Sequence, residues 1–132
     1  MSLERAVHQR WVAYRPLERR VPASRVFTGI AAGDVALPYA TVNRISTSIS
    51  ERTTDNEIEE VVLRFEVWTS TLDEAQDIGA TIHERFDGAQ FEFDGGRCLA
   101  MTHIRSDQEL RQRGDWRLSS DYQVITLSER GD

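Results

Sequence analysis

The sequence lacks several residue types, and each shortage excludes a class of protein. Among its 132 residues there is no lysine, so all 16 basic side chains are arginines. The single cysteine, Cys98, cannot form a disulfide within the chain, which excludes a small secreted fold held together by disulfides. No Cys/His signature surrounds Cys98, and we interpret it as a small core residue.

Long apolar runs are also missing. The longest, such as Val61-Val62-Leu63, are far shorter than the roughly 20 apolar residues that cross a bilayer. The first residues, MSLER, lack the apolar stretch of a secretory signal, so we expect synthesis in the cytoplasm and no membrane partner. The net charge of −6 repels phosphate and disfavours tight electrostatic binding to nucleic acid.

No motif of a catalytic or cofactor site occurs. The sequence has no glycine-rich phosphate loop, nucleophile elbow, H-E-x-x-H, paired Cys-x-x-Cys or calcium-loop spacing. His83 and Asp87 have the spacing of a helical ligand pair, but without a third ligand we interpret them as a surface pair. The sequence therefore predicts no enzyme, no cofactor and no metal. The alternative is a small enzyme or ligand-binding domain that uses His83, His103 or Cys98 in a pocket.

The tripeptide RGD occurs twice, at residues 113–115 and 130–132. An adhesion signal would need an exposed loop on an exported protein, and the sequence shows no export signal. We interpret Gly114 instead as the permissive backbone position at a turn into the last strand.

Apolar spacing predicts two helices. From Ser2 to Tyr14, apolar residues recur every three or four positions, with Ser2 as the cap and Pro16 as the stop. From Thr71 to Gly88, a capping box opens a second amphipathic stretch and Gly88 ends it.

The remaining apolar residues alternate with polar ones, as in strands. The predicted strands lie at 25–28, within 34–50, around 61–68, at 91–93, at 97–105 and at 116–128. We predict an α+β fold, an α/β sandwich with two helices on a mixed, mostly antiparallel sheet of about six strands, in one domain over residues 1–132. The polar stretch 46–60 predicts a long β-hairpin whose tip projects, and the last strand is expected to be central.

Charged residues occupy every second position from Arg105 to Arg117. If this segment is extended, its charges share one face, so that it forms either a solvated flap or an ion-pairing arm. The alternating residues are Arg105, Asp107, Glu109, Arg111, Arg113, Asp115 and Arg117.

Four stretches in order carry a resemblance: "ALPYATVNRIS", "IEEVVLRFEVWTS", "LDEAQDIGATIHERF" and "GDWRLSSDYQVITLSE". Over nearly its whole length the chain resembles the tail terminator proteins of long-tailed phages, the lambda-type tail completion family that also occurs in gene transfer agents. The resemblance implies a structural virion protein without catalytic residues. It also implies a twisted mixed sheet, with segments 51–57 and 106–115 mobile until assembly.

In function, the resemblance implies a hexameric ring that caps the tail tube. Such a ring ends tube polymerisation at the length set by the tape measure protein and forms the tail side of the head–tail joint. The partners would be its own copies, the tube protein and a head completion or connector protein, with DNA passing through the channel without specific binding. The location would be the head-proximal end of the virion tail, after synthesis in the bacterial cytoplasm. Another head–tail component, such as a head completion protein or a tube subunit, is the alternative.

A closed ring needs two different surfaces that fit each other. We predict these contacts at the hairpin tip, with Glu51, Arg52, Asp55 and Glu57, and at the charged loop, with Asp107, Arg111, Arg113 and Asp115.

Overall fold

The computed structural model describes residues 2–31 and 35–129. Within them, three α-helices and six strands follow one another along the chain. The helices are α1 (Leu3–Ala13), α2 (Arg15–Arg20) and α3 (Leu72–Phe86), with a 3₁₀ turn at Ala23–Arg25. The strands are β1 (Val26–Phe27), β2 (Tyr39–Arg52), β3 (Asn56–Thr69), β4 (Phe91–Phe93), β5 (Gly96–Leu110) and β6 (Trp116–Glu129). None of the described helices is long and apolar enough to cross a membrane.

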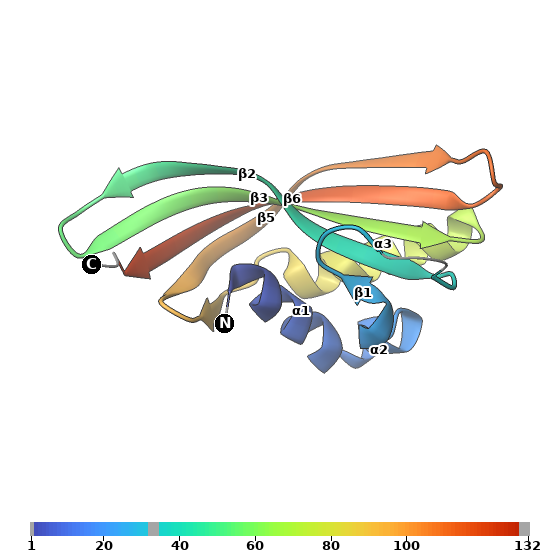
Figure 1. The fold of residues 1–132 in the computed structure, drawn as a ribbon, viewed down its shortest axis with the longest axis horizontal. Coiled ribbons are helices and arrows are strands. Elements are labelled where there is room, and N and C mark those ends of the chain that lie inside the picture. The colour runs from blue at the N-terminus through green and yellow to red at the C-terminus, as the bar shows by residue number, and fades with distance from the viewer. Residues whose placement is uncertain (1, 32–34, 130–132) are drawn as a thin grey trace.

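The strands form one mixed sheet in the order β1-β2-β3-β6-β5-β4. Only the short pairing of β1 with β2 is parallel, so the α+β class is confirmed. The sheet is strongly twisted and curled, and all three helices lie on one of its faces (Figure 1). A second covering layer, which a sandwich would require, is not seen in the described part of the chain.

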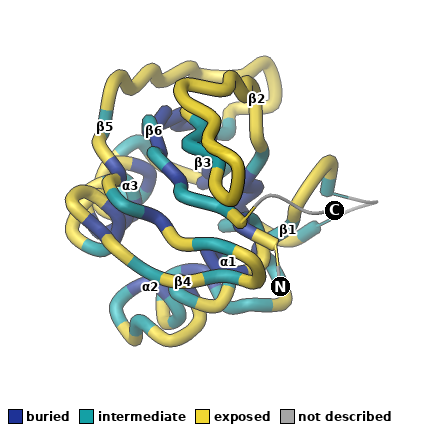
Figure 2. Tube along the Cα trace, turned by 90° about the vertical axis from the view of Figure 1, so that its left-hand side faces the viewer, coloured by how far each residue is buried: buried dark blue, intermediate teal, exposed yellow. Residues whose placement is uncertain are grey.

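The core lies between the helices and the covered face of the sheet. Alternate residues of β3, from Val61 to Val67, point into it, and β6 contributes Tyr122 and Val124. Figure 2 shows these buried positions enclosed by the helices, with exposed backbone around the long strands. The central position of β6, between β3 and β5, confirms the prediction from its apolar residues on both faces.

Helix α3 has the predicted boundaries. The Thr71 hydroxyl accepts a hydrogen bond from the Glu74 N–H at 3.2 Å, and the Glu74 carboxylate accepts one from the Ser70 N–H at 3.3 Å. Gly88 follows the helix with φ +79°, a conformation that glycine adopts without strain. Its N–H donates to the Met101 carbonyl at 2.7 Å, which fixes the chain reversal against β5.

The sequence predicted two helices, but the structure has three. Pro16 does not stop the first helix but lies in the first turn of α2, where its missing N–H removes no helical bond. The break comes at Tyr14, whose extended backbone separates the two helices. The Ser2 cap is confirmed, because its hydroxyl accepts from the Arg5 N–H at 3.1 Å.

Two predicted details of the long strands need correction. β2 and β3 pair antiparallel, but their tip does not project alone, because β6 flanks β3 down to the pair of Asn56 with Glu129. The charged segment is largely strand, since β5 continues to Leu110 and leaves a loop of only residues 111–115. Gly114, with φ +88°, makes the predicted turn into β6. The second RGD lies outside the described residues.

Trp11 gives a test of how the helices are fastened to the sheet. Its ring is fully buried, stacks near Phe65 and donates from Nε1 to the Val21 carbonyl at 3.0 Å. We expect Trp11→Phe to lower the free energy of unfolding by about 2 kcal/mol, because a buried carbonyl loses its donor and a small void opens. Chemical denaturation measures the change. Tyr14→Phe, which removes only an exposed contact of 3.5 Å to Glu84, should change stability by less than about 0.5 kcal/mol.

Candidate assembly interfaces

The hairpin tip holds the first predicted group of interaction residues. Arg52 ends β2 and pairs with Glu57 across the strands, with Nε to Oε2 at 3.2 Å. Asp55 lies in the turn, and the Glu51 and Asp55 side chains are exposed without an ion-pair partner among the described residues. The Asn56 carbonyl accepts from the Thr53 N–H at 2.8 Å, which closes the turn. The structure thus brings the four predicted residues together at one end of the sheet.

Acidic groups crowd behind the tip. Burial raises the pKa of Glu59, and the neighbouring Glu57 raises it further through a hydrogen bond and its charge. Arg44 and Arg52 act in the opposite direction but do not cancel the effect. Burial is thus the main cause of the raised pKa of Glu59, and the Glu57 carboxylate adds to it.

The second predicted group lies at the turn between β5 and β6. Asp107 lies within β5, whereas Arg111, Arg113 and Asp115 lie in or at the end of the loop. The Arg111 N–H donates to the Asp115 carbonyl at 2.8 Å, and the Gly114 N–H donates to the Arg111 carbonyl at 2.9 Å. Arg111 and Arg113 are exposed, and no described acid lies within ion-pair distance of either.

The two predicted groups lie at opposite ends of the molecule. Figure 1 shows the β2–β3 turn at one end of the long axis and the β5–β6 turn at the other. Register explains the separation, because β3 and β6 pair from Asn56 with Glu129 at one end to Thr69 with Trp116 at the other. Of the predicted residues, Glu51 and Asp55 thus lie without an ion pair at one end, and Arg111 and Arg113 lie without one at the other.

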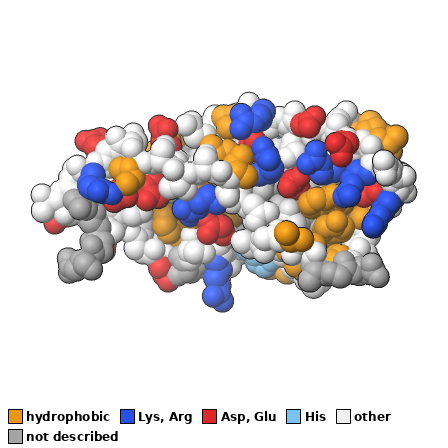
Figure 3. Space-filling view, turned by 45° about the horizontal axis from the view of Figure 1, so that its top comes forward, with side chains coloured by type: hydrophobic (Ala, Val, Ile, Leu, Met, Phe, Trp, Pro, Cys, Tyr) orange, Lys and Arg blue, Asp and Glu red, His pale blue; other side chains and the backbone are white. Residues whose placement is uncertain are grey.

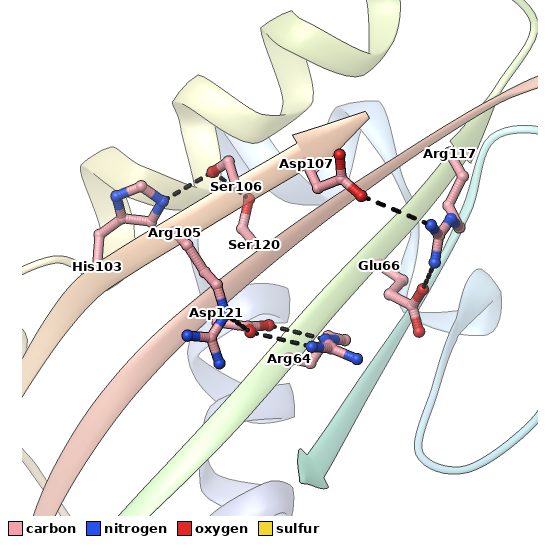
Figure 4. Close-up of polar contacts among 9 residues, drawn as sticks. All are labelled: Arg64, Glu66, His103, Arg105, Ser106, Asp107, Arg117, Ser120 and Asp121. Carbon is pink, nitrogen blue, oxygen red and sulfur yellow. Dashed lines mark hydrogen bonds and ion pairs between the residues drawn. The ribbon is translucent and has the colours of Figure 1, made fainter. Parts of the chain in front are cut away.

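Between these ends, the face of the sheet without helices carries an ion-pair network. Asp121 of β6 is almost fully buried although it lies on this face. Arg64 of β3 donates to its two carboxylate oxygens at 2.8 and 3.1 Å, and Arg105 of β5 donates at 2.7 Å (Figure 4). Burial by itself would raise the pKa of Asp121, but the two guanidinium groups outweigh it and hold the pKa below its usual range. The network links three neighbouring strands.

Arg117 forms a second group on the same face. Its guanidinium donates to Glu66 at 2.8 Å and lies 3.9 Å from Asp107 and 3.8 Å from Glu109. The strand part of the striped segment, with Arg105, Asp107 and Glu109, is therefore an ion-pairing arm, one of the two forms that the sequence left open, whereas Arg111 and Arg113 are not ion-paired. Figure 3 shows basic and acidic side chains intermixed with apolar ones over this side of the molecule. The ion-paired charges of the bare face neutralise one another, so this face has no strong electrostatic field of one sign.

The alternative of a small enzyme can be judged from a hollow of about 290 Å³ between α3 and the sheet, lined by His83, His103, Ser106 and Tyr122 among others. The two histidine rings meet edge to face at 5.4 Å, and His103 Nε2 lies 2.7 Å from the Ser106 hydroxyl. Asp87 does not orient the His103 ring, because its Oδ1 accepts from the His103 backbone N–H instead. The arrangement therefore lacks the acid–histidine contact of a catalytic triad.

Cys98 lies in the core, and His83 pairs with Asp87 at the surface. Cys98 is buried, and burial raises the pKa of its thiol to about 11, which disfavours the nucleophilic thiolate. His83 Nε2 lies 3.6 Å from Asp87 Oδ2 on an exposed helix surface, which confirms the predicted surface pair. Within residues 2–31 and 35–129, no three His, Cys, Asp or Glu side chains are placed to hold a metal ion.

Sequence reasoning missed the centre of the ion-pair network. Arg64 and Asp121 come from strands that are 57 residues apart, and their contact depends on register. A signal was present, because polar positions in an otherwise apolar strand mark the face that is not packed in the core.

These observations define a class of fold: a twisted, mixed six-stranded sheet with helices on one face and an ion-pair network on the other. The chain belongs to the family described as Tail completion protein gp17, whose profile matches residues 5–127. It is thus a structural assembly protein of the phage tail type, as the resemblance implied.

A solved structure, "Virion of native gene transfer agent (GTA) particle", contains a chain of similar fold. The TM-score is 0.78 at 17% sequence identity, and the alignment covers 98% of this chain and 96% of that one. At this identity the likeness shows the fold. No protein with a curated description matches the sequence significantly.

The Asp121 network predicts a pH-dependent loss of stability. Because the folded state lowers the pKa of Asp121, its stabilisation is present above the pKa of the unfolded chain and is lost as pH falls through the folded value. Asp121→Asn should lower the free energy of unfolding by about 2 kcal/mol at pH 7 and converge with the wild type below about pH 3. Denaturation across pH checks this. Asp107→Asn, which removes a contact of 3.9 Å, should have little effect at either pH.

Glu59, near the hairpin tip, predicts a pH dependence of stability of the opposite sign, because folding raises its pKa. A carboxyl whose pKa is raised on folding stabilises the fold below the unfolded pKa, and this contribution is lost as pH rises through the folded pKa. Glu59→Gln, which cannot ionise, should therefore be more stable than the wild type at pH 7, by no more than about 1 kcal/mol. The difference should vanish below about pH 4 in thermal unfolding. Equal stability of the two proteins at pH 7 would contradict a raised pKa of Glu59 in the folded protein.

Proposed function

We propose that this protein caps the tail tube as a hexameric ring, ends tube polymerisation and forms the tail side of the head–tail joint. Its partners are its own copies, the tube protein and a head completion or connector protein, with the tape measure protein setting the tail length. DNA passes through the ring without specific binding. The site of action is the head-proximal end of the tail, and residues 1–132 act as one domain.

The observation that carries this proposal is the separation of two unlike charged groups at the ends of one sheet. A ring of identical copies needs two different surfaces on each copy, so that the front of one meets the back of the next. The tip residues, with Glu51 and Asp55 unpaired, and the loop arginines Arg111 and Arg113 supply such a pair. Membership of the tail completion family supports placing this contact in the tail.

The proposal is also consistent with the lack of a catalytic or cofactor-binding motif in the sequence. The described residues place no metal-ligand group, and the Ser106–His103 contact lacks an orienting acid. A protein that works by docking needs specific surfaces and a stable frame, which the ion-paired sheet provides.

Electron microscopy of tails produced with and without the gene tests this function. Without the protein, tubes should vary in length or fail to join heads, and a wild-type copy supplied in trans should restore both properties. Normal tail length and normal head attachment without the gene would contradict the proposal. A variant such as Tyr14→Phe, which removes only an exposed hydroxyl contact away from both ends, should complement as well as the wild type.

A further inference from the structure

A groove lies along α3 where this helix meets the second half of β5. It is the hollow of about 290 Å³ described above, and side chains of α3, β5 and β6 line it. On the helix, its lining extends from Gln76 to His83. Because these two residues are seven positions apart, the groove is about 10 Å long. It therefore has room for one long side chain laid along the helix, and we call it the α3 groove.

The middle of the α3 groove is apolar. Gly79 and Ala80 give the helix wall no side chain larger than a methyl group, and Leu118 of β6 lines the groove opposite them. The helix approaches β6 closely here, because a Cβ atom added to Gly79 would collide with the Leu118 side chain. A wall of this kind can hold the methylene groups of a long polar side chain, although it offers them no hydrogen bond.

The end of the groove near the C-terminus of α3 is polar and aromatic. The rings of His83, His103 and Tyr122 meet there, with centroids 5.2 to 6.5 Å apart. Tyr122 is only 1% exposed, yet its hydroxyl has no hydrogen-bond partner among residues 2–31 and 35–129. His103 differs, because its Nε2 lies 2.7 Å from the Ser106 hydroxyl (Figure 4). Buried tyrosine hydroxyls usually have a partner, so this end of the groove suits a group that supplies one.

The charged side chains beside the groove are acidic. One side of α3 carries residues at spacings of three and four, namely Asp73, Gln76, Ala80, His83 and Asp87. Burial raises the pKa of Tyr122, and the charge of Asp87 raises it further, which shows that the carboxylate acts on the groove. Asp73 is exposed and has no ion-pair partner in the described part of the chain. Since no described arginine lines the groove, its charge favours a cation over an anion.

We propose that the α3 groove binds an arginine side chain of a protein other than the chain's own copies. The methylene groups of that arginine lie along the apolar middle, and its guanidinium group stacks on the histidine rings. Its N–H groups donate to the Tyr122 hydroxyl and to the Asp87 carboxylate. Arginine fits better than lysine, because a planar guanidinium group stacks on rings and offers five donors at once.

The position of the groove distinguishes it from the proposed contacts between copies. Its strand residues lie at 103–106 of β5 and 118–122 of β6, inside both strands and on the side that carries α3. The inference rests on the proposed function, in which the two ends of the sheet join copies into a ring. A ring that links the tube to the head-side proteins needs a further surface for one of them, and we assign the α3 groove to that contact.

NMR signals of the histidine rings test the site, because the chain has only three histidines. At a fixed pH of about 8, where free histidine is uncharged, N-acetyl-arginine amide should shift the signals of His83 and His103. His8, on α1 and outside the groove, is the internal control and should not respond. Half-saturation should need at least about threefold less of the arginine amide than of the lysine or norleucine amide. No response to the arginine amide, or an equal response to the glutamate amide, would overturn the proposal.

Two substitutions separate binding from folding. Tyr122→Phe removes a hydroxyl without a partner in the fold, so this variant should unfold at the same denaturant concentration as the wild type. It should nevertheless bind the arginine amide at least about threefold more weakly. Ala80→Leu fills the apolar middle and should abolish the shifts. Ala13→Leu, at an exposed alanine of α1, is the matched control and should bind as the wild type does. Wild-type binding by Ala80→Leu would place the amide elsewhere and overturn the proposal.

Assembled particles test whether a partner protein uses the groove. Ala80→Leu should give fewer tails joined to heads, or tails of irregular length, compared with Ala13→Leu. The purified Ala80→Leu protein should keep the self-association of the wild type in sedimentation. Loss of that self-association would make the groove a contact between copies, and the partner that we propose would be wrong. Normal tails with Ala80→Leu would also refute the partner contact, but they would leave the proposed ring intact, since the ring is refuted by normal tails without the gene.

Discussion

The pairing of β3 with β6 is the interaction on which the rest of the structure depends. It runs unbroken from Asn56 with Glu129 to Thr69 with Trp116, so at about 3.3 Å per residue these central strands span roughly 45 Å. That length exceeds what the helices cover, and it holds the acidic tip and the arginine loop at fixed positions far apart. If β3 and β6 were shorter, the two charged groups would lie close together within one molecule and could neutralise each other.

The bare face of the sheet shows how paired and unpaired charges divide their roles. Asp121, Arg64 and Arg105 satisfy one another, so their removal from water is compensated within a single copy. The free edges leave backbone groups, isoleucines and charges without partners. In our account the ion-paired set stabilises the subunit, and the proposed contacts between subunits lie at the two ends of the sheet.

Much of the fold could be predicted from local patterns. The capping box at Thr71, the turn at Gly114 and the central position of β6 each follow from a few neighbouring residues. Helix α2 could not, because six residues are too few for a periodic signal and Pro16 can either end a helix or begin one. The alternating charges after Arg105 concealed the end of β5, since a strand without apolar residues resembles a loop.

The candidate interfaces were predictable only as groups of charges. The sequence predicted that Arg52 lies near Asp55 and Arg111 near Arg113. It did not predict the free strand edges beside these residues. The contact of Asp121 with Arg64 and Arg105 depends on register and on the bulge between His103 and Arg105, which are properties of the folded sheet. Free edges are likewise invisible in a sequence, because they depend on how far the neighbouring strands extend.

The central claim is that copies of this protein form a closed ring where tail meets head. Electron cryo-microscopy of that junction in intact particles tests it most directly. The account predicts six copies of this fold around the channel between the tail tube and the head-side proteins, each in contact with the next. Density for this fold at the distal tail end, or separate subunits at the junction that do not touch one another, would contradict it.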